Sequence, residues 1–302
     1  MGFGAVIVAG KQPPSSGSFA PLVQAGSISV IKRIIYTLQQ AKVSPIVVMT
    51  GYEADQLERH VERTGVICMR DVDYESTSEL ETLKQGIAEI QNQCQGIVVP
   101  SVQTPFFKGE TIERLVAEAR PFAWADTEEG SCPYPLCMDK AGMMAVEAAE
   151  DPETLIALAK RYGVKGVATM DDGIGKPLGT ETEALIASYN QVFLRPLIKV
   201  SLAREEVFFG PGTAQLLHLI QRTGSVRTAC EQMHLSYSKA WKMIGKMEKE
   251  MGESVVKRFQ GGQSGGRAEL TPRGEDLLLR FTRFERECKD RVEEIYKDYF
   301  QS

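Results

Sequence analysis

The sequence predicts an α/β domain with a mostly parallel sheet, followed by a smaller and mainly helical module. Residues 1–191 alternate short apolar runs with stretches of helical periodicity, which is typical of βαβ units. The pattern changes near Pro196, and a Gly-Pro-Gly breaker at residues 210–212 then precedes a series of helices. A chain of 302 residues is long enough for two domains, and we place the second at residues 192–302.

The composition is that of a globular protein, with 43% hydrophobic and 25% charged residues. No apolar run reaches the roughly 18 residues of a membrane span, and the first residues lack the basic segment of a signal peptide. The six cysteines form no CxxC pair and the three histidines are scattered, so we expect reduced thiols and no structural zinc. We therefore expect a cytoplasmic protein with no membrane partner.

Positive charge is concentrated in one segment. The whole chain has a formal net charge of −5, yet residues 222–273 contain ten lysines and arginines against five acidic residues. A basic segment in an acidic protein indicates a nucleic-acid-binding surface confined to the second module.

The first domain is predicted to contain four strands, each followed by a helix. The strands are residues 5–9, 45–50, 65–69 and 96–99. The helices are residues 28–41, 53–63, 78–92 and 111–119, with further helices at 153–162 and 181–189. A loop rich in Gly, Pro and Ser joins the first strand to the first helix. Short apolar runs separated by helices are typical of strands buried on both faces of a sheet.

The second module has the element order of a winged helix. Residues 197–209 predict two short strands, and three helices follow at 213–222, 226–234 and 237–251. Ser225 and Ser236 are suitable N-caps for the second and third helices, and a tight break between two helices is the helix-turn-helix signature. Strand-like residues 254–260 and 267–270 flank a glycine-rich tip, and Pro272 starts a last helix.

The third helix of this module has an apolar stripe and a lysine face. The stripe comprises Tyr237, Ala240, Trp241, Ile244, Met247 and Met251, and the lysines are Lys239, Lys242, Lys246 and Lys249. A lysine face alone is compatible with simple solvation. The wing favours DNA, because Lys257, Arg258 and Arg267 flank a glycine tip whose backbone can approach phosphates closely.

The segments GPGTAQLLHLIQRTGSVRTACEQMHLSYSKAWKMIGKMEKE and GGQSGGRAELTPRGEDLL resemble the DNA-binding domain of molybdate-responsive, ModE-type regulators, which have a LysR-like helix-turn-helix. The resemblance implies that the third helix enters the major groove and that the wing touches the backbone. The implied base-reading residues are Ser236, Tyr237, Ser238 and Lys239, and the remaining candidate DNA contacts are Lys242, Lys246, Lys257, Arg258 and Arg267. We expect Trp241 in the core. We expect none of the molybdate-binding domains that usually follow in that family.

The segments AVIVAGKQPPSSGSFAPLVQAGSISVIKRII, VVMTGYEADQLERHV, TLKQGI and VQTPFFKGETIERL resemble MobA-like nucleotidyltransferases, which attach CMP or GMP to molybdopterin. The resemblance implies a Rossmann-like fold of the nucleotide-diphospho-sugar transferase type over residues 1–191. It also implies a nucleotide (CTP or GTP) or molybdopterin-type ligand. The candidate ligand-binding residues are Ala9, Gly10, Gly17, Thr50 and Gly51.

The catalytic groups of that family are missing at the aligned positions. Its phosphate-binding Arg and Lys fall on residues 13–15 and Ala20, and its two magnesium-binding Asp residues fall on Gln103 and Gly179. Neither Gln nor Gly supplies the anionic oxygen that Mg²⁺ prefers, and nucleotidyl transfer depends on that charge. We therefore expect no catalytic residue and no resident metal. The alternative is an active enzyme with a displaced metal site built from Asp71, Asp73, Asp171 and Asp172.

The last helix carries a heptad-like seam that predicts a homodimer. The seam comprises Leu277, Phe281, Phe284, Cys288, Val292, Ile295 and Tyr299, at spacings of 4, 3, 4, 4, 3 and 4. A helix of nearly thirty residues extends about 40 Å, which is further than a small winged domain can cover. A dimer would read an inverted-repeat operator in double-stranded DNA. The alternative is that the seam packs on its own chain.

These observations predict a DNA-binding transcriptional regulator linked to molybdenum or molybdopterin cofactor metabolism. Its first domain would serve as a ligand sensor, or as an interaction module for a molybdenum enzyme or a cofactor-related ligand. The alternative is an active molybdopterin cytidylyl- or guanylyltransferase with a fused DNA-binding domain.

Overall fold

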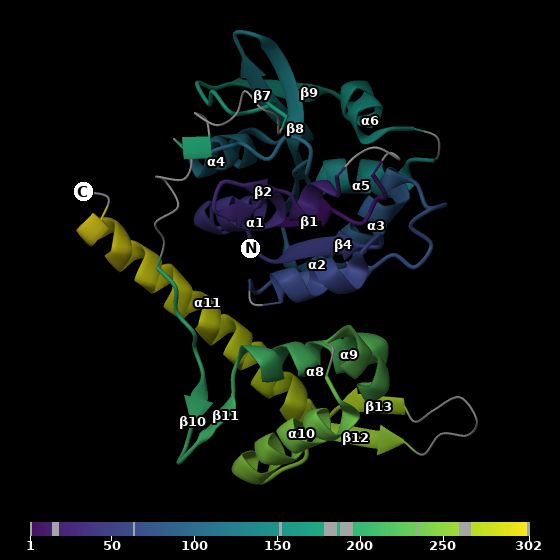
Figure 1. The fold of residues 1–302 in the computed structure, drawn as a ribbon, viewed down its shortest axis with the longest axis vertical. Helices are drawn as coiled ribbons and strands as arrows, with labels where there is room; N and C mark the ends of the chain where they lie inside the picture. Colours follow the sequence, from purple (N-terminus) through teal and green to yellow (C-terminus); the bar gives the residue numbers. More distant parts are fainter. Residues whose placement is uncertain are drawn as a thin grey trace. The chain divides into compact units, whose positions relative to one another are not determined.

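The computed structural model describes residues 2–13, 18–62, 64–150, 153–177, 186–187, 196–233, 235–259 and 267–300. The chain divides into two compact units, Met1–Phe193 and Leu194–Ser302, each with its own hydrophobic core (Figure 1). Several predicted features lie outside the described residues: Gly17, Gly179, most of the 181–189 helix, and the wing tip.

The first unit is built on a seven-stranded sheet with the order β5-β4-β1-β6-β8-β7-β9. The strands are β1 Phe3–Val8, β4 Ile46–Thr50, β5 Ile67–Arg70, β6 Gly96–Val99, β7 Phe122–Thr127, β8 Gly130–Asp139 and β9 Val164–Ala168. All run parallel except β8, which pairs antiparallel with both β6 and β7. The predicted α/β class with a mostly parallel sheet is confirmed.

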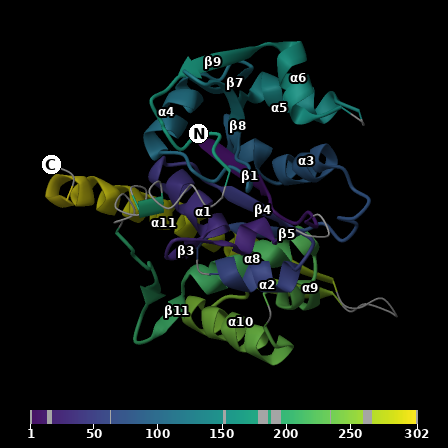
Figure 2. The same ribbon diagram turned by 45° about the horizontal axis from the view of Figure 1, so that its top comes forward.

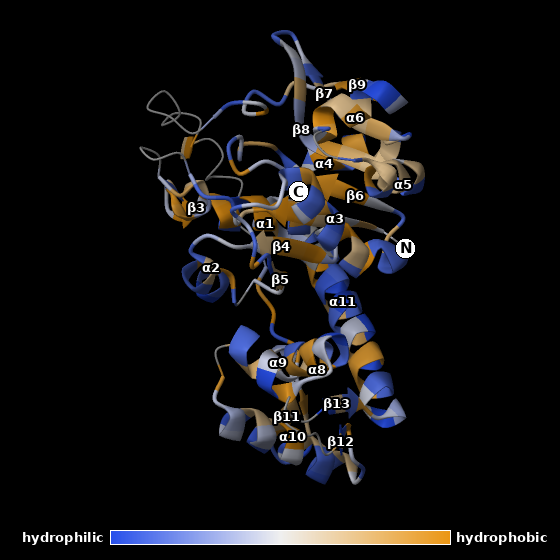
Figure 3. Ribbon diagram, turned by 90° about the vertical axis from the view of Figure 1, so that its right-hand side faces the viewer, coloured by the Kyte–Doolittle hydropathy of each residue, from blue (hydrophilic) through white to orange (hydrophobic). Residues whose placement is uncertain are grey.

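Helices cover both faces of this sheet (Figure 2). On one face lie α1 Val30–Gln40, α2 Ala54–Val61 and α4 Gly109–Glu118. On the other lie α3 Glu79–Ile90, α5 Lys140–Ala148 and α6 Leu155–Tyr162. The remaining elements are the short turns η1 Ala20–Leu22 and η2 Gln91–Gln93 and the hairpin β2 Gln24–Ala25 and β3 Ile28–Ser29. Burial on both faces explains the apolar sequences of β4 and β6, which are orange in Figure 3.

The structure adds elements that the sequence pattern did not reveal. Strands β7, β8 and β9 and helix α5 were not predicted. β8 contains Pro133 and Pro135. Proline is rare in central strands, so the sequence pattern did not indicate a strand here. The first helix begins at Val30 because residues 28–29 pair with β2 instead.

The second unit has the predicted winged-helix order. The hairpin β10 Leu202–Ala203 and β11 Val207–Phe209 precedes α8 Pro211–Thr223, α9 Val226–Gln232 and α10 Tyr237–Met251. The wing strands β12 Val256–Phe259 and β13 Arg267–Leu270 pair antiparallel, and α11 Pro272–Phe300 follows. The Ser225 hydroxyl accepts a hydrogen bond from the Thr228 amide, and Ser236 accepts one from the Lys239 amide, so both predicted N-caps are present.

The first part of α11 belongs to the core of the winged unit. Leu277 and Phe281 are buried, and the Phe281 ring lies edge-on to Phe209 with centroids 4.8 Å apart. Further along the seam, the exposed fractions of Phe284, Ile295 and Tyr299 are 47%, 56% and 77%. The seam therefore packs on its own unit at its first two positions and is exposed at these three, whereas Cys288 and Val292 between them are half-buried.

None of the described helices has both the length and the apolar content required to cross a membrane. The six cysteines are free thiols, and Cys94, Cys137 and Cys230 are buried. Burial raises the pKa of the Cys94 thiol to about 11, so this group stays protonated at neutral pH.

Candidate ligand crevice and nucleic-acid interface

The predicted ligand residues meet where β1 and β4 end. β1 lies between β4 and β6, so the order of strands reverses at β1, and ligands of open α/β sheets bind outside the carboxyl ends of strands at such points. The Ala9 amide donates to the Met49 carbonyl at 3.0 Å, and the Tyr52 amide donates to the Gly10 carbonyl at 2.8 Å. The segments that follow β1 and β4 are thereby held side by side.

Both glycines at this junction are required by packing. A Cβ on Gly10 would overlap the backbone of Gly51, and a Cβ on Gly51 would lie 2.6 Å from the Cβ of Tyr74. Thr50 is fully buried, and its hydroxyl donates to Glu58 Oε1 at 2.7 Å, so its side chain faces the interior. Only backbone groups of these candidate residues are left to meet a ligand.

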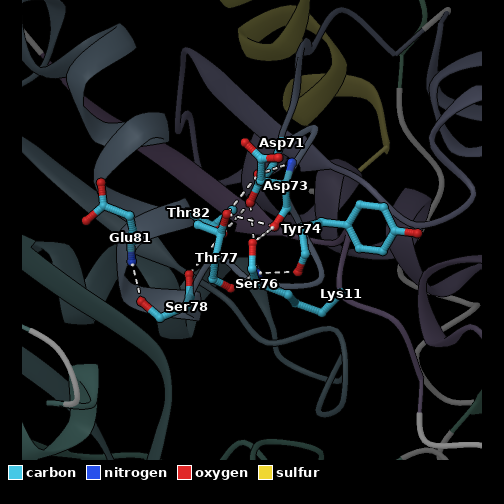
Figure 4. A network of polar contacts seen from close by, with 9 residues as sticks. All are labelled: Lys11, Asp71, Asp73, Tyr74, Ser76, Thr77, Ser78, Glu81 and Thr82. Atoms are coloured by element: carbon cyan, nitrogen blue, oxygen red, sulfur yellow. Dashed lines mark hydrogen bonds and ion pairs between the residues drawn. The ribbon is translucent and has the colours of Figure 1, made fainter.

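A lysine that the sequence analysis overlooked lies beside this junction. Lys11 directly follows Gly10, and its Nζ donates to the carbonyl oxygens of Tyr74 at 3.1 Å and Thr77 at 2.5 Å (Figure 4). Burial lowers the pKa of Lys11, while the nearby carboxylates of Asp71 and Glu79 oppose this shift. Lys11 therefore fastens the segment after β1 to the loop after β5.

Asp71 anchors the same loop from within. Its buried carboxylate accepts hydrogen bonds from Thr82 Oγ1 at 2.8 Å, Thr77 Oγ1 at 3.2 Å and the Asp73 amide at 3.1 Å. Figure 4 shows these side chains turned toward one another, with the Tyr74 ring pointing away from them. The Asp71 oxygens thus accept hydrogen bonds from donors of this loop and from Thr82 in α3.

Asp171 has a comparable role at the end of β9. Its buried carboxylate accepts from the Lys108 amide at 2.7 Å and from Thr111 Oγ1 at 2.6 Å, which holds the start of α4. Its neighbour Asp172 lies 3.2 Å from Lys108 Nζ, and a hydrogen bond from that ammonium lowers the pKa of Asp172. Asp71 and Asp73 follow β5 whereas Asp171 and Asp172 follow β9, and these are the two outer strands of the sheet. The described residues do not bring the four acids together.

The family's metal position does not fit Mg²⁺ here. Gln103 is exposed and uncharged, and its backbone N–H donates to Ser101 Oγ at 3.1 Å. An amide oxygen supplies less negative charge than the carboxylate oxygens that hold Mg²⁺ in nucleotidyl-transfer sites. The second aligned position, Gly179, lies outside the described residues.

Three partly exposed aromatic rings lie along the glycine junction. Phe19 and Tyr52 meet edge-to-face with centroids 5.3 Å apart, and Tyr52 and Tyr74 do so at 6.4 Å. Rings of this kind can stack on a planar heterocycle. The three residues are far apart in sequence, and no motif identified them.

The predicted DNA-reading residues form the exposed start of α10. Ser236, Tyr237, Ser238 and Lys239 are exposed, and so is Lys242 one turn from Ser238. The helix N-terminus adds a positive end to this surface, which suits a phosphate. The structure therefore presents the predicted residues together on one turn of the helix.

The six predicted cations differ in whether an acid neutralises them. Lys246 Nζ lies 2.7 Å from Glu206 Oε2, which lowers the pKa of that carboxyl, and Arg267 is ion-paired with Glu269. Within the described residues Lys239, Lys242, Lys257 and Arg258 have no acidic partner. The unneutralised charge therefore lies on the first half of α10 and on β12.

Trp241 is partly buried against the core of the winged unit. Its ring meets Tyr237 edge-to-face at 5.9 Å, and the guanidinium carbon of Arg258 lies 3.2 Å from its centroid. Trp241 thus packs as predicted on one side and supports a wing arginine on the other.

Comparison with known proteins shows the family to which the chain belongs. The sequence profile described as the MobA-like NTP transferase domain matches residues 5–166 of this chain, which is more than half of it. The chain belongs to the MobA-like NTP transferase domain family. A second profile, described as the bacterial regulatory helix-turn-helix protein of the lysR family, matches residues 213–275. Both resemblances inferred from the sequence are confirmed.

Curated relatives of this MobA-like protein include regulators. The chain is 37% identical over 75 residues to the transcriptional regulator ModE of Yersinia pestis, covering 25% of this chain and 28% of that one. It is 38% identical over 82 residues to the molybdenum-pterin-binding protein MopB of Rhodobacter capsulatus, covering 27% of this chain and 30% of that one. The chain thus spans about a third of the length of the curated relatives it matches.

A solved structure supports the fold of the MobA-like domain. The crystal structure of Rv0371c from Mycobacterium tuberculosis aligns with a TM-score of 0.52 at 16% identity, and the alignment covers 63% of this chain and 97% of that one. At this identity the likeness concerns the fold alone.

Proposed function

We propose that this protein is a DNA-binding transcriptional regulator whose MobA-like domain senses a ligand or a partner and does not transfer nucleotides. The observation that carries the proposal is the exposed start of α10, where Ser236 to Lys239 lie beside cations that have no acidic partner among the described residues. The match to a helix-turn-helix profile over residues 213–275 supports this reading.

Both domains support a link to molybdenum or molybdopterin cofactor metabolism. The first domain belongs to the MobA-like family, and the relatives that match part of the chain include ModE regulators and a molybdenum-pterin-binding protein. The effector in this proposal is a nucleotide or a molybdopterin-type compound. Its planar ring would stack near Tyr52 and Tyr74, beside the backbone of Gly10 and Gly51.

The proposed assembly is a cytoplasmic homodimer on an inverted-repeat operator. The exposed apolar side chains along the second half of α11 support a helix–helix interface between two copies. Two copies related by a two-fold axis present two recognition helices, and matching half-sites follow from that symmetry.

DNA binding is tested by fluorescence anisotropy on the promoter of the protein's own gene and on random DNA of equal length, over a series of salt concentrations. We expect tighter binding to the promoter and a steep salt dependence, because lysines and an arginine replace counterions on the phosphates. Lys239→Ala should weaken promoter binding, and Lys140→Ala, an exposed lysine of the first unit, is the matched control. Equal affinity for both DNAs would refute the proposal.

Membership of the MobA-like family favours a second candidate, an active cytidylyl- or guanylyltransferase. It is tested by incubating the protein with CTP or GTP, Mg²⁺ and molybdopterin cofactor and measuring pyrophosphate. Steady release at about 1 s⁻¹ or faster, as is normal for enzymes, would establish the transferase. Calorimetric binding of a nucleotide or pterin without pyrophosphate release would support the sensor.

A further inference from the structure

We propose that Trp241 is a positioning residue that holds the Arg258 guanidinium as a clamp for one DNA phosphate, between the recognition helix and the wing. This inference rests on the proposed DNA-binding function. The guanidinium carbon of Arg258 lies 3.2 Å from the centroid of the Trp241 ring, which is a stacking distance. The pair joins α10 to β12.

The alternation of side chains along β12 places Arg258 on the face of the strand that packs against the core of the winged unit. Side chains two residues apart on a strand share a face, so Arg258 lies on the same face of β12 as Val256, which is buried in the core of the winged unit. Arg258 itself is exposed. Its stem can follow the core surface while its charged head reaches solvent above the indole.

Stacking leaves the useful edges of the guanidinium open. The N–H donors of arginine lie in the plane of the group, so a ring against its face does not block them, and a planar fork suits two oxygens of a phosphate. Within the described residues Arg258 has neither an ion pair nor a hydrogen-bond acceptor. An arginine held in place before binding loses less side-chain entropy when it meets DNA.

Trp241 is itself well supported. It lies one turn after Tyr237, the two rings meet edge-to-face at 5.9 Å, and the indole also packs against the core. Its indole Nε1 is buried and has no hydrogen-bond partner among the described residues. The π face of this residue, and not its N–H group, is therefore the feature that would hold Arg258.

The other wing cations do not share this arrangement. Arg267 is ion-paired with Glu269 on the same strand, so part of its charge is already neutralised. Lys257 lies over the Phe259 ring, with Nζ 5.1 Å from the centroid, but its ammonium is a point charge without a planar fork. Arg258 is thus the wing cation best prepared for a two-point phosphate contact, and Arg267 is its matched control.

The test is a double-mutant cycle on full-length protein, read by anisotropy on promoter DNA over a salt series. Arg258→Ala should weaken binding about tenfold and flatten the slope of log K against log salt by about one, as expected for one lost phosphate contact. Arg258→Lys should recover the slope but only part of the affinity. Arg267→Ala should change both quantities less.

Trp241→Leu keeps an apolar side chain against the core and removes the π face. We expect it to weaken binding several-fold in the native background and to have no further effect in the Arg258→Ala background, because Trp241 acts through Arg258. Trp241→Phe, which retains a ring, should bind nearly as well as the native protein. Unchanged circular dichroism and melting temperature exclude misfolding of the variants.

Two results separate the clamp from the wider proposal. If native protein prefers the promoter but Trp241→Leu costs the same in both backgrounds, the clamp is wrong and DNA binding stands. If native protein shows no preference and no salt dependence, the DNA-binding function and the clamp both fail.

Discussion

Lys11 and Thr77 are joined by a hydrogen bond of 2.5 Å from the lysine Nζ to the threonine carbonyl, across 66 positions of sequence. The same ammonium donates to Tyr74 and lies 3.9 Å from Asp71 Oδ2. One side chain therefore closes the loop after β5 onto the segment after β1, at the carboxyl ends of these strands.

Lys11→Ala should lower the free energy of unfolding of the first unit by about 1–2 kcal/mol. The carbonyls of Tyr74 and Thr77 lose a charged donor, and the estimate is kept low because the lysine side chain is 31% exposed. Urea unfolding followed by Trp124 fluorescence, in a Trp241→Phe protein, measures the change within the first unit. Lys140→Ala, which removes an exposed lysine without an ion pair or side-chain hydrogen bond among the described residues, should leave the midpoint unchanged. Equal midpoints for both variants would contradict a structural role for Lys11.

His60 should make the first unit less stable in mild acid. Its Nε2 lies 2.7 Å from the Ser29 hydroxyl, and burial, followed by the nearby Lys32 charge, lowers the pKa of His60 from its ordinary value of 6.5. The unfolded chain then takes up a proton at a pH where the folded protein does not. Stability is full above pH 6.5, declines as the pH falls below it, and levels off once the folded-state pKa is passed.

His60→Gln isolates that contribution, because a glutamine amide can still bond to Ser29 but does not titrate. Unfolding midpoints at pH 7.5 and 5.5, measured in the same buffers, give the loss for each protein. We expect a smaller loss for His60→Gln than for the native protein. An identical loss would mean that other groups cause the acid sensitivity.

The sequence was sufficient where periodicity and local caps determine the structure. The parallel strands β1, β4, β5 and β6 and the three helices before the wing follow from apolar runs and from caps such as Ser225 and Ser236. β8 was not predicted, because its prolines lower its strand propensity. It forms a strand nevertheless, because pairing with β6 and β7 outweighs that low propensity.

The candidate sites show the same limit. The start of α10 was predictable because its residues are consecutive. Lys11 was not, because its partners lie 63 and 66 positions away and only the fold brings them close. Nor could the sequence reveal that Glu206 neutralises Lys246 whereas Lys239 remains without an acidic partner among the described residues.

This difference between lysines gives a prediction for DNA binding. Lys239→Ala should cost about 1–3 kcal/mol of promoter affinity if its ammonium reads a base edge. Lys246→Ala should cost less, because Lys246 Nζ already lies 2.7 Å from Glu206 and must leave that partner to contact DNA. Glu206→Gln frees Lys246 and should tighten binding slightly and steepen the salt dependence. A larger loss for Lys246→Ala than for Lys239→Ala would show that the DNA lies further along α10 than proposed.

The second half of α11 should hold two copies together. Leu277 and Phe281 pack within their own unit, but Phe284 is 47% exposed although it continues the same apolar seam. Exposed apolar side chains at heptad spacing are stabilised when two helices pair, and a carboxylate placed between the helices would be desolvated without a partner. Light scattering should therefore give twice the 33.4 kDa chain mass for the native protein and a lower mass for Phe284→Asp.

Leu279→Asp is the matched control, since Leu279 is 52% exposed on the same helix but lies off the seam. It introduces the same carboxylate and should leave the mass of the dimer unchanged. Because two linked recognition helices bind an inverted repeat far more tightly than one, Phe284→Asp should also lower operator affinity, whereas Leu279→Asp should not. A native monomer that binds a palindromic site at full affinity would rule out the dimer and leave the exposed half of α11 without this role.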